Sequence, residues 1–500
     1  MGRFCGSVPT LVCLGLLIVC ADSLPATVKE SFFPDHSDEE LASLEYVRDR
    51  LKELNQREAS GFGSSPDFGT QSPRSDAPSN YSILDINRPA AEYLYQGDIL
   101  LSPNQVDHLL TSRSKRQAMN MNYAEFRFSR WPRDNKGVIP YTLNGFDYNS
   151  QNLIRQAFQY WQDRTCVRFA ENARGHQIYV FHGGPQGGCY SALGREYYTR
   201  NAWNQAVQAG FQRLSLGTNC LHFGIIIHEI GHALGFFHEH SREDREKYIS
   251  VNYRNVNASM VFNFDVQPIA KNYNFGQPYD YGSIMQYGQY GFALNRNYPA
   301  IYPTRGHENH VYTMGQRIGP SFLDLLMMNK LYGCLDRCKN SQTVCKNNGF
   351  NNPKNCAQCI CPSGFGGQDC SVRHLGNNLG QTCGADLKAT TKWQNFSFNV
   401  GSRAYWPIRP FHSFCHWLIT APKGQRVQIY VHQISGQCIN DGCPHNNVEF
   451  KMEEDLTNTG FRFCCNQVVA NKSFVSAKEM AVVSAYARSV QFLQISYKIA

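Results

Sequence analysis

Three histidines and one glutamate lie close together in the sequence, with the spacing of a metal site. His228 and His232 are four residues apart, so on a helix they share one face and can bind the same ion. Gly235 can end that helix with a positive φ, and the chain can then turn back and bring in His238. Three neutral imidazoles leave the fourth position of a tetrahedral zinc open for water, which is typical of catalytic zinc sites. Glu229 could take a proton from that water.

These side chains need a buried helix that ends in a sharp turn. The residues around the histidines are mostly apolar and predict a helix over residues 223–236. The alternative is a buried helix with incidental histidines, but three unpaired imidazoles in so apolar a stretch would be costly. We therefore expect one Zn²⁺ in this catalytic domain.

The length, composition and charge of the chain indicate which classes of protein it can belong to. It has 500 residues, 42% of them hydrophobic, and a formal net charge of +8. This apolar content supports several folded domains and rules out a wholly disordered chain. No long basic block is present, so a nucleic-acid partner is not expected.

The N-terminus predicts secretion. Arg3 is followed by an apolar run over residues 8–20 and then by small and polar residues, which is typical of a cleaved signal peptide over residues 1–21. The alternative is a membrane anchor, but the run is short for a membrane span. No later stretch is long enough either, so we expect a secreted, extracellular protein.

The 19 cysteines are unevenly placed: three lie in the predicted signal, none in residues 21–165, and sixteen from Cys166 onward. An even number in a secreted chain predicts disulfides. Six of them lie within residues 338–370, a segment with too little apolar surface to fold without crosslinks. Zinc binding by Cys356, Cys359 and Cys361 is the alternative, and it is disfavoured because secreted thiols are usually oxidised.

A cysteine-free segment, residues 22–116, ends in a basic sequence. Its last residues include Arg113, Lys115 and Arg116, the Arg-x-Lys-Arg pattern that proprotein convertases cut. A short basic run is often only a solvated surface, but this one lies where the first cysteine-bearing domain begins. We therefore expect a propeptide, cleavage by a convertase after Arg116, and synthesis as a zymogen.

The remaining patterns predict a multidomain protein. Strands are expected over residues 137–143, 166–169, 178–181, 426–431 and 490–495, and helices over residues 38–58 and 149–164. The fold class is then an α+β domain with a zinc cleft, followed by a disulfide-rich module and a β-sandwich. Candidate glycosylation sites are Asn80, Asn257, Asn395 and Asn471.

The long histidine motif resembles that of a known family. His-Glu-x-x-His-x-x-Gly-x-x-His followed by Glu239 is similar to the motif of the astacin family of metzincin zinc proteases. Residues 283–288 resemble the family's Met-turn. The resemblance implies that Met285 forms an apolar floor below the zinc ligands and that Tyr287 helps to stabilise the oxyanion, so the protein would be a zinc metalloendopeptidase.

The resemblance extends to both sides of this domain. Tyr95-Gln96-Gly97-Asp98 is similar to the family's zymogen motif, which implies that Asp98 takes the zinc position of the catalytic water until cleavage. The cysteine-rich segment resembles an EGF-like module, and the chain after Cys383 resembles a CUB domain, an order that looks most like nematode astacin-type proteases. The implied domains are a signal peptide (1–21), a propeptide (22–116), an astacin-like peptidase domain (117–334), an EGF-like domain (335–371) and a CUB domain (383–500).

Disulfides and substrates follow from the same resemblance. The implied disulfides are Cys166–Cys334, Cys189–Cys220, Cys338–Cys356, Cys345–Cys359, Cys361–Cys370, Cys383–Cys415, Cys443–Cys464 and Cys438–Cys465, with exchange between the last two pairs left open.

Arg305 lies where the family shapes a substrate pocket and would favour an acidic residue after the cut bond, although a surface arginine is the ordinary case. The expected substrates are extracellular matrix, cuticle collagen or egg-envelope proteins. Two rivals are a binding protein with a silent protease domain and a different zinc hydrolase. The intact zinc motif argues against the first, and the Met-turn and the zymogen aspartate Asp98 argue against the second.

Overall fold

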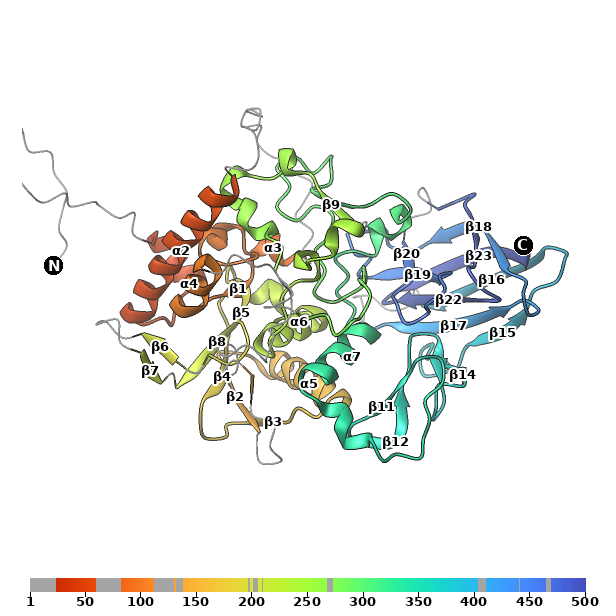
Figure 1. Cartoon of the computed structure of the whole chain (residues 1–500), viewed down its shortest axis with the longest axis horizontal. Coiled ribbons are helices and arrows are strands. Elements are labelled where there is room, and N and C mark those ends of the chain that lie inside the picture. The colour runs from red at the N-terminus through yellow and green to blue at the C-terminus, as the bar shows by residue number, and fades with distance from the viewer. Residues whose placement is uncertain are drawn as a thin grey trace, which may run out of the picture.

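The computed structural model describes residues 24–59, 82–111, 130–131, 138–196, 198–200, 206–208, 210–267, 273–402, 411–439, 441–464 and 469–500. Helices from the N-terminal segment lie on one side of a central α+β domain, and a β-sandwich formed by the C-terminal residues lies on the other (Figure 1). The cysteine-rich segment lies below the junction of the central domain and the sandwich in this view (Figure 1). Within these residues, no helix is both long and apolar enough to cross a lipid bilayer.

A six-stranded sheet forms the framework of the central domain, in the order β1-β5-β8-β4-β2-β3. Its strands are β1 (Ile99–Leu100), β2 (Ile139–Asn144), β3 (Phe169–Glu171), β4 (Gln177–Phe181), β5 (Cys189–Ala192) and β8 (Phe211–Leu216). All neighbours run parallel except β5 and β8. The edge strand β1 precedes the basic sequence at residue 116, so the expected propeptide extends the sheet of the domain that it precedes.

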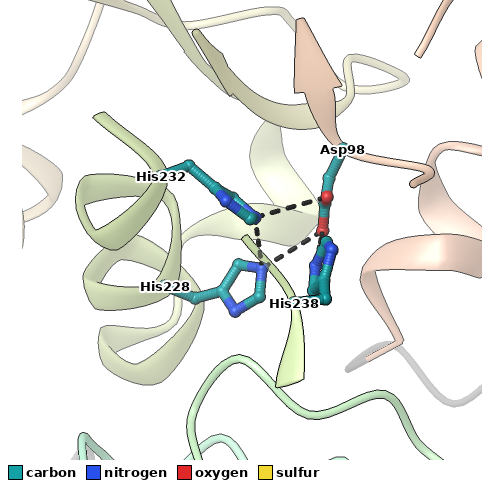
Figure 2. A group of neighbouring side chains, drawn as sticks. All are labelled: Asp98, His228, His232 and His238. Atoms are coloured by element: carbon teal, nitrogen blue, oxygen red, sulfur yellow. Dashed lines mark hydrogen bonds and ion pairs between the residues drawn. The ribbon is translucent and has the colours of Figure 1, made fainter. Parts of the chain in front are cut away.

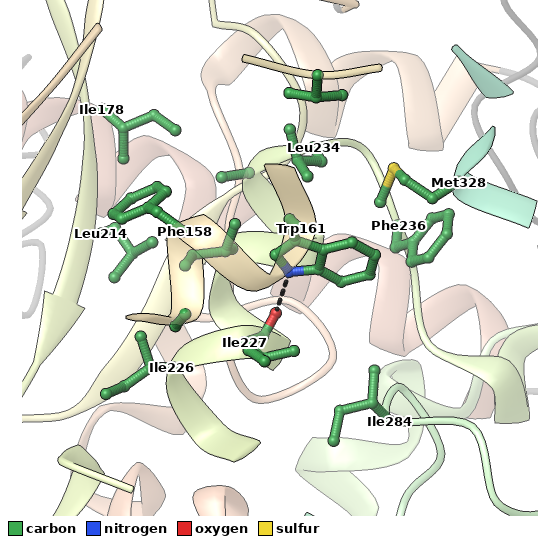
Figure 3. Close-up of a cluster of buried hydrophobic side chains, with 14 of the residues drawn as sticks. Phe158, Trp161, Ile178, Leu214, Ile226, Ile227, Leu234, Phe236, Ile284 and Met328 are labelled. Carbon is green, nitrogen blue, oxygen red and sulfur yellow. Dashed lines mark hydrogen bonds between the residues drawn. The ribbon is translucent and has the colours of Figure 1, made fainter. Parts of the chain in front are cut away.

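Two packed helices lie in the core of this domain, and the second carries the histidine motif. Helix α5 (Tyr148–Arg164) is capped by Asp147, whose side chain accepts a hydrogen bond from the backbone of Ser150 at 2.8 Å. Its apolar stripe, which includes Phe158 and Trp161, packs against α6 (Phe223–Ala233), and the indole of Trp161 donates to the carbonyl of Ile227 at 3.2 Å (Figure 3). The bond and the packing set the position of α6 in the core.

One predicted strand is wrong over most of its length. Residues 166–168 are not in a strand, and β3 begins only at Phe169. Their backbone donors are satisfied elsewhere, since the amide of Cys166 donates to Cys334 Sγ at 3.0 Å and that of Val167 to Thr165 Oγ1 at 3.2 Å. The disulfide and the local turn therefore replace a strand ladder. The other predicted elements occur within a few residues of their expected bounds, and helix 223–236 ends early, at Ala233.

The N-terminal segment contains α1 (Ala26–Phe32), α2 (Asp38–Ala59), α3 (Ile83–Ile86) and α4 (Pro103–Thr111). Helix α2 buries Val47, Leu51 and Leu54 in a cluster that includes Phe262 of the central domain. A second cluster joins Phe32 and Phe33 to aromatic residues of the sheet. Because apolar burial is the main source of docking free energy, these contacts hold the segment against the central domain. Residues 60–81, which connect α2 to α3, lie outside the described residues.

The rest of the central domain is mostly irregular and contains a few short elements. They are β6 (Tyr198–Arg200), β7 (Ala206–Gln208), β9 (Ile249–Val251), β10 (Ile301–Pro303) and α7 (Phe322–Leu331). Helix α7 starts with a capping box between Ser321 and Asp324.

Two small hairpins and a sandwich follow. The hairpins are β11 (Phe350–Asn352) with β12 (Asn355–Ile360), and β13 (Phe365–Gly366) with β14 (Val372–Arg373). One sandwich sheet has the order β15-β17-β22-β19-β20 and the other β16-β23-β18-β21. The strands are β15 (Gly384–Lys388), β16 (Gln394–Gly401), β17 (Ser413–Thr420), β18 (Val427–Ser435), β19 (Asn446–Lys451), β20 (Phe461–Phe463), β21 (Ser473–Val475), β22 (Met480–Ala487) and β23 (Val490–Ile499). We call residues 383–500 the C-terminal sandwich.

Seven disulfides crosslink the described residues, and all seven are pairs that the resemblance implies. They are Cys166–Cys334, Cys189–Cys220, Cys338–Cys356, Cys345–Cys359, Cys361–Cys370, Cys383–Cys415 and Cys443–Cys464. Cys438 is also disulfide-bonded, but Cys465 lies outside the described residues. Cys356, Cys359 and Cys361 are each in a disulfide, which removes the alternative of a zinc site there.

Candidate active site

Helix α6 and the turn after it bring the three histidines together. His228 and His232 lie one turn apart on α6, and Gly235, with φ +108°, turns the chain so that His238 approaches from another direction. Their rings lie 4.6–5.3 Å apart between centroids, and all three side chains are fully buried. The sequence-predicted ligand set is therefore assembled in one place (Figure 2).

Each imidazole is oriented by a bond at its Nδ1 atom. Nδ1 of His228 lies 2.8 Å from the carbonyl oxygen of Ile284, and Nδ1 of His232 lies 2.6 Å from that of Phe236. Nδ1 of His238 lies 3.0 Å from Oε1 of Gln96. Carbonyl oxygens only accept, so each Nδ1 carries the proton and each Nε2 presents a lone pair to the centre of the site, as a metal-binding histidine does.

Asp98, from the segment before residue 116, faces the same centre. Its Oδ2 lies 3.1 Å from Nε2 of His228 and 3.2 Å from Nε2 of His238, and its Oδ1 lies 3.4 Å from Nε2 of His232 (Figure 2). Burial raises the pKa of Asp98, but positive charge on the adjacent His238 and His232 outweighs it and lowers the pKa well below its usual value. The carboxylate is therefore anionic where a cation would bind.

This donor set fits zinc. One ligand atom from each of Asp98, His228, His232 and His238 lies within 4.8 Å of the others. Three imidazole nitrogens and one carboxylate oxygen match the ligand types and the number of a tetrahedral zinc site. Oδ1 of Asp98 has no hydrogen-bond partner among the described residues, which leaves it free to bind a metal.

Glu229 lies on α6 beside the first histidine. Both of its carboxylate oxygens are buried, and neither has a hydrogen-bond partner in the described part of the chain. Burial, and then the nearby carboxylate of Asp98, raise the pKa of Glu229 well above its usual value. Such a group has a high proton affinity and free lone pairs, which suits a general base.

The turn at residues 283–287 lies against α6. Its start is held by Asp324 of α7, which accepts hydrogen bonds from Ser283 Oγ at 2.6 Å and from the amide of Ile284 at 2.8 Å. Met285 packs beside α6, where a Cβ on Gly231 would lie 3.2 Å from the Met285 sulfur. Met285 therefore lies beside the helix that carries His228 and His232, and its role as the apolar floor below the zinc ligands stays a prediction.

Tyr287, two residues further, points into the site. Its ring lies 4.6 Å from that of His238 and stacks on His240 at 3.7 Å between centroids. Its hydroxyl donates a short hydrogen bond to the carbonyl of Gln96. Burial raises the pKa of Tyr287 well above its usual value, so the group remains a hydrogen-bond donor at neutral pH.

Comparison with known proteins agrees with this geometry. Residues 124–333 match the sequence model of Astacin, a peptidase family. The chain is 33% identical to Zinc metalloproteinase nas-27 of Caenorhabditis elegans over 409 residues, which cover 79% of this chain and 88% of that protein.

The chain belongs to the astacin family. It is therefore a zinc metallopeptidase, and Zn²⁺ is the metal of its three-histidine site. Zinc metalloproteinase nas-31 of the same nematode is 35% identical over 426 residues, which cover 83% of this chain and 65% of that protein, so the chain spans somewhat less than two thirds of this relative. Among solved structures, High choriolytic enzyme 1, a hatching enzyme zinc-protease from Oryzias latipes, is 32% identical, with 43% of this chain and 98% of that chain covered and a TM-score of 0.37.

Several predicted residues lie away from this astacin site or outside the described residues. Arg113, Lys115, Arg116 and Asn80 are outside the described residues. Asn257, Asn395 and Asn471 are exposed, as glycosylation requires. Arg305 is exposed and does not line the small cavity that adjoins Tyr287, so its role in substrate selection stays a prediction.

Two residues of the site were not predicted from the sequence. Gln96 orients His238 with its side chain and accepts from Tyr287 with its carbonyl, and its place next to Asp98 in the zymogen motif was the available signal. Arg317 lines the cavity beside Tyr287. No local pattern marks Arg317, because it reaches the site only through the packing of the loop before α7.

Proposed function

We propose that this astacin-family chain is a secreted zinc endopeptidase made as an inactive zymogen. The observation that carries the proposal is the position of Asp98, which lies 3.1–3.4 Å from the three histidine Nε2 atoms and precedes the basic sequence at residue 116. A segment that fills the site and lies before a protease-sensitive junction is suited to hold the enzyme inactive until it is cut.

The catalytic roles follow from what each residue can do with a proton. When bound, zinc polarises the peptide carbonyl and acidifies a water molecule. Glu229, whose oxygens are unpartnered among the described residues, takes a proton from the attacking water and later delivers it to the leaving amine. The hydroxyl of Tyr287 donates to the oxyanion that develops on the carbonyl oxygen.

The propeptide engages both catalytic elements at once. Asp98 takes the place of the water, and the carbonyl of Gln96 binds the hydroxyl of Tyr287. Strand pairing between Ile99 and Ser191 holds this segment along the edge of the sheet. Cleavage after Arg116 by a proprotein convertase would release the segment, which frees Tyr287 and the fourth ligand position together.

Secretion and modification are part of the same proposal. A signal peptide over residues 1–21 directs the chain outside the cell, where disulfides are stable, and seven disulfides in the described residues support this compartment. Exposed Asn257, Asn395 and Asn471, together with Asn80, are the proposed glycosylation sites.

The domains are proposed to be a peptidase domain (117–334), an EGF-like domain (335–371) and a CUB domain (383–500). Pairing of the six cysteines of 338–370 as first to third, second to fourth and fifth to sixth supports the EGF-like assignment. Two facing sheets support the CUB assignment. The proposed substrates are extracellular matrix, cuticle collagen or egg-envelope proteins.

The function is tested with the full chain after convertase treatment. We expect peptide hydrolysis that a chelator abolishes and added zinc restores, and loss of hydrolysis in Glu229→Gln with zinc content unchanged. The matched control is Glu243→Gln, because Glu243 is exposed. Normal turnover by Glu229→Gln would overturn the assignment of the base, and absence of hydrolysis by the processed wild type would overturn the function.

A further inference from the structure

The C-terminal sandwich packs against Gly288, the residue that follows the turn at residues 283–287. Gly288 follows Tyr287, and a Cβ on Gly288 would lie 2.0 Å from Oδ1 of Asp441 in the sandwich. A Cβ on Gly442 would lie 2.3 Å from the backbone of Gly315. Glycine at these positions therefore permits a loop of the sandwich to pack against the backbone beside the active site.

Buried polar contacts hold the sandwich in this position. The amide and hydroxyl of Thr459 donate to the carboxylate of Asp280 at 3.3 and 3.2 Å, and the amide of Arg462 donates to Thr313 Oγ1 at 2.9 Å. Asp280 and Thr313 are 2% and 0% exposed. Buried hydrogen bonds of this kind tolerate little displacement, so the loop at Asp441 has a defined place.

A small cavity joins this loop to the catalytic site. Its volume is about 20 Å³. Three parts of the chain line it: the propeptide with residues 82–84 and Asp98, the peptidase domain with Tyr287 and Arg317 among others, and the sandwich with Asp441 and Pro444. The space is small because the propeptide fills it. When the propeptide leaves, the pocket opens beside Tyr287, and the sandwich remains as one of its walls.

The open pocket contains one positive and one negative side chain. Nε of Arg317 and Oδ1 of Asp441 are both buried and have no hydrogen-bond partner among the described residues. The pKa of Asp441 is raised to about 6, mainly by burial and also by Asp85 of the propeptide, against the opposite effect of Arg296 and Arg317. Asp85 leaves with the propeptide, which removes a negative neighbour and favours the ionised form of Asp441 in the active enzyme.

We propose that the C-terminal sandwich forms part of the substrate-binding site: Asp441 and Pro444 wall the pocket beside Tyr287, and the carboxylate of Asp441 offsets the charge of Arg317, so that the pocket does not favour the acidic side chains that Arg317 alone would attract. This inference rests on the proposed peptidase function. An acidic substrate side chain that enters the pocket is attracted by the charge of Arg317 and repelled by the charge of Asp441. A neutral side chain of the same shape is affected by neither charge. The sandwich thereby sets the preference at one position near the cut bond.

The test uses the full chain after convertase treatment and a set of quenched peptides that differ at one position at a time, with Glu compared with Gln and Asp with Asn. We expect Asp441→Asn to raise the ratio of kcat/KM for the acidic peptide over its amide partner about tenfold at one position. Asp441→Ala should shift the same ratio in the same direction. Asp455→Asn is the matched control, since Asp455 is an exposed carboxylate of the sandwich, and it should leave the ratio unchanged.

The outcomes separate this inference from the function on which it rests. If the wild type and both Asp441 variants cleave the amide peptides and have the same acidic-to-amide ratio of kcat/KM at every position, the inference is wrong and the peptidase function stands. A wild-type preference for acidic residues that Asp441→Asn leaves unchanged would also overturn it and favour a role for Arg305. Failure of the processed wild type to cleave any peptide would overturn the proposed function itself. Thermal unfolding of each variant shows that the fold is intact.

Discussion

Acidification should loosen the propeptide because of one buried histidine. His36 lies between α1 and α2, its side chain is 9% exposed, and neither ring nitrogen has a hydrogen-bond partner among the described residues. Its ring packs against Phe33 and Phe181 at 5.1 and 6.2 Å between centroids. Burial and the nearby Arg213 lower the pKa of His36 from 6.5 to about 3, against a smaller opposite effect of Glu40.

The sign and size of the effect follow from this shift. The undocked propeptide binds a proton at His36 below pH 6.5, whereas the docked form does not until about pH 3, so docking weakens as the pH falls through this window. Between pH 7.5 and pH 5 the loss is about 2 kcal/mol, or roughly 30-fold in the docking equilibrium, from the linkage relation with these two pKa values.

The measurement needs a zymogen that cannot be processed. We would introduce Arg116→Ala and divide the peptide hydrolysis rate of the zymogen by that of the mature enzyme at pH 7.5 and at pH 5, because the mature enzyme corrects for the pH dependence of catalysis. The ratio should rise about 30-fold in acid with His36 present and stay nearly flat in His36→Phe. Hydrogen exchange of the α2 amides reports the same opening without catalysis.

The reasoning would be refuted by an equal acid response in both proteins. If His36→Phe loosens as much as the parent zymogen between pH 7.5 and 5, another group controls the response. If neither loosens, His36 titrates alike in the docked and undocked states, and its burial does not carry the predicted free energy.

Three further predictions concern docking and the core. Glu40→Gln removes the bidentate pair with buried Arg213, at 2.8 Å to each oxygen, and should raise the activity of the uncleaved zymogen by about 10–30-fold, while exposed Glu39→Gln should not. Asp324→Ala removes the acceptor for Ser283 and Ile284, and it should lower the free energy of unfolding by about 2–4 kcal/mol in a denaturant titration. A loss of less than about 1 kcal/mol would contradict the role of Asp324 in holding the turn at residues 283–287. Trp161→Ala should lower the same free energy by about 3–5 kcal/mol, and exposed Tyr148→Ala should change it little.

The metal ligands could be predicted from the sequence because their geometry is local. Residues four apart on a helix share a face whatever surrounds them, so His228 and His232 follow from spacing alone, and Gly235 indicates the turn that returns His238. The prediction of a strand at residues 166–169 was wrong for a related reason. The sequence pattern is local, but the backbone amides of Cys166 and Val167 donate to Cys334 and to Thr165 instead of to a neighbouring strand. A local pattern does not include such partners.

The sequence by itself determined the zinc-binding motif, the helix that presents it and the cluster of six cysteines within residues 338–370. Only the tertiary structure decided which distant residues meet there: Asp98 and His228 are 130 residues apart, and Gln96 and Tyr287 are 191 apart. The loop of Asp441 beside Gly288 is likewise invisible in either stretch alone. Helix and strand periodicities repeat within one element and so appear in the sequence, whereas contacts between elements depend on how whole surfaces pack, which no short stretch encodes.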